Sequence, residues 1–320
     1  MKKILLGLLV LLLGVALALP WLRDRERGPL DADARAGAPG RFVELRHGAV
    51  HVLESGPADG VPVLLVPGFS VPSYVFEPLD RELADAGFRS IRFDLYGRGW
   101  SARPDVVYDR DLFATQVEDL LAALEIERAH LVGLSMGGAI VGRFVARHPE
   151  AAQQVVLIAP LTRARDIAPL QWPWLGEWLT RVWLLPKLAA SQMSDFVHPE
   201  RHAGWAQRFE PQMRYDGFGR ALLSTLRHVM TQDSLQDFAA LGKRGAPVLL
   251  VWGRQDSVVP FAHHEAVQAA IPQLQLLALD EAGHLPHREH PERVATAVID
   301  FLRRTDAAAD ASATTTEDER

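Results

Sequence analysis

Short apolar runs alternate with amphipathic stretches over most of this chain. Strand-like runs bounded by turn residues are expected at about 41–45, 49–55, 62–66, 89–94, 129–134, 154–159, 247–252 and 274–279. Helical spacing of apolar residues is expected near 73–87, 111–125, 136–148, 262–271 and 291–304. Continuous runs such as residues 63–66 suit strands covered on both faces. The pattern predicts an α/β protein with a mostly parallel central sheet of about eight strands, helices on both faces and an antiparallel hairpin near Gly48.

This alternation stops between Pro160 and Leu241. Five of the eight tryptophans fall there, namely Trp172, Trp174, Trp178, Trp183 and Trp205. Residues 161–241 are therefore expected to form a helical cap, inserted into a core made of residues 41–160 and 242–304. Because the insertion follows the sixth expected strand, we expect the cap to lie above the carboxyl edge of the sheet.

The chain begins with an apolar segment. Lys2 and Lys3 precede an uncharged stretch over 4–22, which as a helix would be about 28 Å long, close to the hydrocarbon thickness of a bilayer. Residues 1–22 are interpreted as a membrane anchor, in preference to a secretory signal cleaved near residues 16–18. Arginines at 23, 25 and 27 oppose the two lysines under the positive-inside rule. The rest of the chain is expected outside the cytoplasm, and secretion or release into the periplasm after cleavage is the alternative.

Two further segments are not expected to form part of the core. Residues 23–40 are rich in Arg, Asp, Gly, Ala and Pro, which is typical of a linker. Residues 305–320 have almost no large apolar side chains, so we expect a disordered tail.

Charge and cysteine content exclude several classes of function. The net charge of −6, without a basic run carrying aromatics, argues against a nucleic-acid partner. The chain has no cysteine, which excludes thiol catalysis, disulfides and cysteine-ligated zinc.

Ser135 is the candidate nucleophile. It stands in Gly133-Leu-Ser-Met-Gly137, directly after an expected strand and before an expected helix. A strand-to-helix turn of this kind needs glycine on both sides because neighbouring backbone comes very close, and it exposes the serine Oγ at strained backbone angles. The pentapeptide alone also occurs in ordinary loops, so its context carries the prediction.

A serine needs an imidazole to take its proton and a carboxylate to orient that imidazole. Asp256 follows the expected strand at 247–252, and His284 follows the expected strand at 274–279. Both residues should lie on loops at the same edge of the sheet as Ser135. His287 and His290 compete with His284, and we expect them to be solvated or hydrogen-bonded loop residues.

These motifs, together with Asp94-Leu-Tyr-Gly-Arg-Gly-Trp-Ser101, resemble those of serine hydrolases of the α/β-hydrolase superfamily, in the esterase and lipase-like group with a helical cap. The resemblance covers roughly residues 41–304 and implies Ser135, Asp256 and His284 as catalytic residues. It also implies an oxyanion hole from the backbone N–H groups of Phe69 and Met136, although Pro67 replaces the usual histidine of that loop. The resemblance implies no cofactor and no metal.

The resemblance leaves the substrate open. We expect a small hydrophobic carboxylic ester, with Trp174 and Trp178 as first candidates to line the substrate pocket. Cleavage of carbon–carbon bonds, amides or peresters by the same residues is the alternative, as is a non-catalytic sensor on this scaffold. Leu134, where some carbon–carbon hydrolases of the superfamily carry asparagine, favours esters. The oligomeric state is not predicted.

Overall fold

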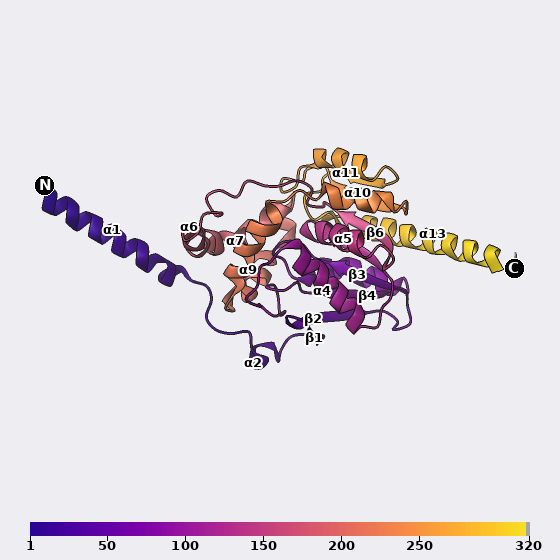
Figure 1. Ribbon diagram of the computed structural model, residues 1–320, viewed down its shortest axis with the longest axis horizontal. Coiled ribbons are helices and arrows are strands. Elements are labelled where there is room, and N and C mark those ends of the chain that lie inside the picture. The colour runs from indigo at the N-terminus through magenta and orange to yellow at the C-terminus, as the bar shows by residue number, and fades with distance from the viewer. Residues whose placement is uncertain (318–320) are drawn as a thin grey trace.

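Eight strands form one mixed sheet in this computed structural model, which describes residues 1–317 and the side chains of residues 1–304 (Figure 1). The strands lie in the order β1-β2-β4-β3-β5-β6-β7-β8, with β2 antiparallel to both of its neighbours and the remaining pairs parallel. The predicted fold class is confirmed. Their bounds are β1 (Arg41–Leu45), β2 (Gly48–Ser55), β3 (Pro62–Val66), β4 (Arg89–Phe93), β5 (Ala129–Leu134), β6 (Ala152–Ile158), β7 (Val248–Gly253) and β8 (Gln275–Leu279).

Helices cover both faces of the sheet because successive strand residues point to opposite sides. Leu64 and Val66 pack in one hydrophobic layer, whereas Val63 and Leu65 pack in the other. The first layer contains α4 (Arg110–Ala123), α5 (Met136–Arg147), α10 (Leu235–Lys243) and α11 (His264–Ala270); the second contains η1 (Ser73–Phe76), α3 (Glu77–Asp85) and α13 (Pro291–Glu317). The continuous apolar runs are thereby buried on both sides.

The cap is a set of short helices between β6 and α10. It comprises α6 (Leu175–Leu179), η2 (Thr180–Leu184), α7 (Leu185–Ser191), η3 (Gln192–Asp195), η4 (Pro199–His202), α8 (Trp205–Phe209), η5 (Glu210–Arg214), α9 (Phe218–Thr225) and η6 (Leu226–Met230). Helix α10 packs against α5 and α11, in the core layer. From here on, the cap means residues 161–234, slightly shorter than the expected 161–241.

The N-terminal helix α1 (Lys2–Arg23) projects from the body, and none of its residues is buried (Figure 1). Within the described part of the chain, it alone is long and apolar enough to cross a membrane, a test that a signal sequence also passes. The segment expected to be a linker contains α2 (Ala32–Arg35) and is bound to the cap, since Gly28 pairs with Tyr215.

At the other end of the chain, α13 continues to Glu317. The expected disorder of residues 305–320 stays a prediction, and its last part, residues 318–320, lies outside the described residues.

Candidate active site

Ser135 lies on a strained turn between β5 and α5. Its φ of 54° and ψ of −118° are outside the regions that side-chain-bearing residues ordinarily adopt. A Cβ added to Gly133 would lie 2.6 Å from the Gly137 carbonyl oxygen, and one added to Gly137 would lie 2.6 Å from that of Pro67. Both glycines are required for this close packing, as the sequence pattern indicated.

Asp256 and His284 form a buried pair on the loops that follow β7 and β8. Nδ1 of His284 lies 2.8 Å from Oδ2 of Asp256. The other carboxylate oxygen accepts hydrogen bonds from the backbone N–H groups of Val258 (2.8 Å) and Val259 (2.9 Å). The carboxylate is therefore held by the chain around it and in turn fixes the imidazole ring.

The pKa of His284 reflects opposing effects. Burial favours the neutral ring, but the charge and hydrogen bond of Asp256, together with the charge of Asp195, outweigh burial and raise the pKa of His284 above its usual value. With Nδ1 committed to Asp256, Nε2 is the nitrogen left to accept a proton. This is the arrangement that a general base beside a serine requires.

Ser135 and His284 line the same cavity, of about 230 Å³, between the sheet edge and the cap. Gly68, Phe69 and Ser70 form another part of its wall, and a Cβ on Gly68 would lie 3.4 Å from Cβ of Ser135. The loop after β3 thus passes within van der Waals contact of the candidate nucleophile. Met136 is the first residue of α5, where backbone N–H groups have no partner within the helix.

The α/β-hydrolase fold family profile matches residues 61–291, most of the chain. The chain belongs to the α/β-hydrolase fold family. Over 238 residues it is 31% identical to the 2-hydroxymuconate semialdehyde hydrolase of Pseudomonas sp. (strain CF600), covering 69% of this chain and 78% of that protein. It is 25% identical to the carboxylesterase YbfK of Bacillus subtilis, covering 82% of this chain and 86% of that protein. The solved structure of a thermophilic esterase from Thermogutta terrifontis matches with a TM-score of 0.70 and 26% identity, covering 83% of this chain and 99% of that one.

Trp174 and Trp178 were expected to line the substrate pocket of this α/β-hydrolase, but neither lines the Ser135 cavity. The Trp174 side chain is 89% exposed, and Nε1 of Trp178 donates a hydrogen bond to the Ala16 carbonyl of α1. A second cavity, of about 510 Å³, adjoins the Ser135 cavity and shares Phe69, Arg165 and Met230 with it. Its remaining wall is largely apolar and consists of Asp166, Ile167, Ala168, Pro169, Leu170, Leu179, Trp183 and Leu226.

Sequence reasoning missed Arg98, which holds the loop after β3. This fully buried arginine donates through Nε to the Phe69 carbonyl (2.7 Å) and through Nη2 to Thr225 Oγ1 of the cap (2.8 Å). Burial lowers the pKa of Arg98 to about 9. Its position between Gly97 and Gly99 marks it as part of a tight loop, but that spacing does not indicate that the side chain would reach Phe69 and Thr225.

Asp195 of the cap is a second missed residue. It lines the Ser135 cavity, and its backbone carbonyl accepts a hydrogen bond from the His284 N–H (2.8 Å). Burial raises the pKa of the Asp195 carboxyl to about 6, and the negative charge of this carboxyl raises the pKa of His284. No sequence pattern connects a cap aspartate with a loop histidine far along the chain.

The competing histidines have other partners. His287 is buried rather than solvated, and its Nε2 hydrogen bonds to the Val75 carbonyl (3.1 Å). Burial lowers the pKa of His287 to about 3. His290 hydrogen bonds to the Glu281 carbonyl (3.2 Å). Neither ring lines the Ser135 cavity.

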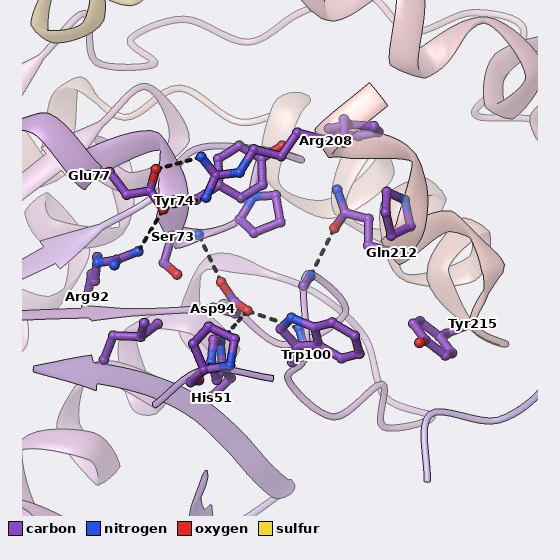
Figure 2. Close-up of a pocket in the computed structure, with 16 residues that line it drawn as sticks. His51, Ser73, Tyr74, Glu77, Arg92, Asp94, Trp100, Arg208, Gln212 and Tyr215 are labelled. Carbon is purple, nitrogen blue, oxygen red and sulfur yellow. Dashed lines mark hydrogen bonds and ion pairs between the residues drawn. The ribbon is translucent and has the colours of Figure 1, made fainter. Parts of the chain in front are cut away.

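A second histidine–aspartate pair, His51 and Asp94, lines part of a further cavity of about 380 Å³ (Figure 2). Asp94 accepts hydrogen bonds from Nδ1 of His51 (2.9 Å) and from the backbone N–H groups of Ser73 (2.8 Å) and Trp100 (3.0 Å). Nε2 of His51 hydrogen bonds to the Pro39 carbonyl. Among residues 1–304, whose side chains the structure describes, no group of three or more histidine, aspartate and glutamate side chains is arranged to hold a metal ion.

Proposed function

We propose that this α/β-hydrolase cleaves carboxylic esters with hydrophobic acyl or aryl groups through an acyl-enzyme on Ser135. The observation that carries the proposal is the buried His284–Asp256 pair. His284 lines the same cavity as Ser135, which lies on a strained turn. That combination supplies a nucleophile, a general base and a group that orients the base.

In the proposed reaction, Ser135 Oγ attacks the ester carbonyl carbon while Nε2 of His284 takes the hydroxyl proton. The N–H groups of Phe69 and Met136 donate to the oxyanion of the tetrahedral intermediate. When the intermediate collapses, the alkoxide leaves with the proton held by His284. Water then attacks the acyl-enzyme, again losing a proton to His284, and the carboxylic acid is released with Ser135 restored.

The apolar cavity next to Ser135 supports a hydrophobic substrate. Each methylene that it buries is worth about 0.8 kcal/mol, or roughly fourfold in kcat/KM. A panel of p-nitrophenyl esters from acetate to decanoate should therefore show kcat/KM rising with chain length until the cavity is full. Leu179→Trp, which adds bulk to that wall, should shift the optimum to shorter chains. Equal rates at all lengths would contradict the proposed acyl site.

Carbon–carbon bond hydrolysis is the second candidate. It is favoured by the 31% identity to a protein named 2-hydroxymuconate semialdehyde hydrolase, whereas Leu134 at the elbow favours esters. A ring-fission dienoate assayed beside the ester panel separates the two, because a carbon–carbon hydrolase should have the larger kcat/KM on the dienoate.

We also propose that α1 anchors the protein to a membrane, with the catalytic part on the extracytoplasmic side. The length and apolar character of α1 support an anchor, and a signal that is cleaved before secretion passes the same test. The mass of the mature chain decides between them, since cleavage near residue 18 would remove the helix.

A further inference from the structure

Exposed tryptophans gather on one part of the cap. Trp172, Trp174, Leu175 and Trp183 are exposed by 52%, 89%, 38% and 52%, and we call them the tryptophan patch. Beyond α1, the other large hydrophobic side chains exposed in the described structure are the scattered Val61, Val107 and Leu276. Tryptophan is the residue that membrane proteins concentrate at the headgroup level, where an apolar ring and a polar N–H are both accommodated.

The tryptophan patch lies beside the apolar helix α1. Nε1 of Trp178 donates to the Ala16 carbonyl (2.7 Å), and a guanidinium nitrogen of Arg23 donates to the Val182 carbonyl (3.1 Å). Trp178 of α6 and Val182 of η2 belong to the same stretch as the patch. Figure 1 shows α1 leaving the body next to α6, and α1 contacts η2. A bilayer that takes in α1 would therefore meet the patch as well.

The segment after α1 fixes this orientation. The Glu26 carboxylate accepts hydrogen bonds from the N–H groups of Gly217 (3.0 Å) and Gly219 (2.8 Å). The N–H of Arg27 donates to the Arg214 carbonyl (2.6 Å), and Gly28 pairs with Tyr215. Residues 26–28 are thus bound along the cap. They hold the cap close to the end of α1, and so close to the surface of a membrane that α1 enters.

Charge near the patch is compatible with a lipid surface. The Lys187 ammonium lies 4.9 Å from the centre of the Trp183 ring, and Arg181 is half exposed. The acidic Asp24 and Glu177 nearby are each within ion-pair distance of an arginine, Arg181 and Arg227. Interfacial tryptophan flanked by basic groups is the pattern that binds headgroups, anionic ones included.

The apolar cavity connects the patch with Ser135. Trp183 belongs both to the patch and to the wall of the 510 Å³ cavity, which shares Phe69 and Met230 with the Ser135 cavity. Residues 167–170 also line this cavity, and Trp172 follows them after Gln171. The 510 Å³ cavity therefore lies between the exposed Trp183 and the cavity that Ser135 lines.

We propose that the tryptophan patch rests in the lipid surface that α1 enters, and that hydrophobic esters reach Ser135 from the lipid through this cavity. The first half rests on the proposed anchoring by α1, and the second half rests in addition on the proposed esterase function. The substrate class is thereby narrowed to esters that partition into a bilayer.

The first test measures docking without catalysis. The chain has no cysteine, so Trp174→Cys and the control Val107→Cys each give one attachment point for a nitroxide, in the full chain carrying Ser135→Ala. The proteins are reconstituted in vesicles of phosphatidylcholine and phosphatidylglycerol. The label at 174 should be protected from a water-soluble relaxation agent and accessible to oxygen, whereas the label at 107 should show the reverse. Equal exposure of both labels to the aqueous agent would overturn the docking.

The second test measures the route. Trp172→Ser with Trp174→Ser, neither of which lines a cavity, should lower hydrolysis of a long-chain umbelliferyl ester dissolved in the vesicles by about tenfold, from the lost burial of two rings. Hydrolysis of p-nitrophenyl acetate in water should stay unchanged, and Val107→Ser should move neither rate. Equal loss on both substrates, or no loss on either, would overturn the route. If the native chain cleaves no ester at all, the proposed function fails, and the nitroxide measurement still decides the docking.

Discussion

Two buried histidine–aspartate pairs in this molecule have nearly the same geometry and different surroundings. Nδ1 of His284 lies 2.8 Å from Asp256, and Nδ1 of His51 lies 2.9 Å from Asp94. Burial opposes the charge of both rings, but the partner carboxylate outweighs it and raises the pKa of both histidines. The pair by itself therefore does not distinguish a general base from a structural ion pair.

The second imidazole nitrogen makes the difference. In His51 both nitrogens face acceptors, Asp94 (Figure 2) and the Pro39 carbonyl. The ring is therefore suited to hold both protons and to stay charged. In His284 only Nδ1 is committed to the carboxylate, and the residue lines the cavity of Ser135. A histidine works as a base only where its second nitrogen is left for a reacting proton.

The histidines should give the largest contrast. We expect His284→Ala to lower kcat by at least about a thousandfold with a nearly unchanged melting temperature, because it removes the proposed general base. His51→Gln should instead lower the melting temperature while the folded enzyme keeps most of its turnover. The measurements are p-nitrophenyl ester hydrolysis per folded molecule and thermal unfolding; a large loss of turnover in His51→Gln alone would reverse the assignment.

The aspartates provide the next contrast. Asp256→Asn should lower kcat by about a thousandfold or more, because the amide favours the wrong imidazole tautomer. Asp94→Asn should act on stability. His51 and backbone N–H groups hold the pKa of Asp94 below its usual value against the effect of burial, so this carboxylate stabilises the fold above its unfolded pKa and loses that contribution as the pH falls.

Urea unfolding at neutral and acidic pH checks this assignment. The cost of Asp94→Asn should be several kcal/mol near neutrality and smaller in acid. A cost that is equal at both pH values would show that the ionised carboxylate is not what the variant removes.

Arg98 should affect kcat more than KM, because it holds the loop of Phe69, whose N–H is proposed to bind the oxyanion. Arg98→Lys breaks the fork that joins the Phe69 carbonyl to Thr225, so kcat should fall by about tenfold while KM stays close to its original value. Arg103→Lys is the matched control, since Arg103 is also largely buried and donates to the carbonyls of Gly99 and Ser101 without contacting Phe69. Equal losses of kcat in the two variants would make Arg98 a structural residue only.

Asp195 should give the smallest effect. Its negative charge raises the pKa of His284, so Asp195→Asn should lower that pKa and move the acid limb of the kcat/KM profile to lower pH. The shift should be less than about one pH unit, because Asp256 makes the larger contribution. An unmoved limb, or one moved to higher pH, would remove Asp195 from the description of the site.

The core and the cap differ in how far the sequence predicts them. Apolar strands such as residues 62–66 and the elbow around Ser135 are specified locally, since their periodicity and glycine spacing follow from the sheet and the turn. The cap is built from short helices, including one-turn π-helices such as η2 and η6, whose positions depend on packing. Periodicity over such short lengths carries little information.

The remaining site residues could not be predicted because their partners are distant in the chain. Arg98 joins Phe69 to Thr225, and Asp195 meets His284 across the cap boundary. Trp174 illustrates the converse: it was expected to line the substrate pocket, yet packing leaves its ring 89% exposed.

We propose that the chemistry belongs to Ser135 and the His284–Asp256 pair rather than to the second pair around His51. Labelling with a fluorophosphonate, followed by peptide mass spectrometry, separates the two pairs. We expect one adduct on Ser135, no labelling of Ser135→Ala, and a strongly slowed reaction in His284→Ala but not in His51→Gln. Undiminished labelling of Ser135→Ala, or an adduct on another residue, would show that Ser135 is not the nucleophile.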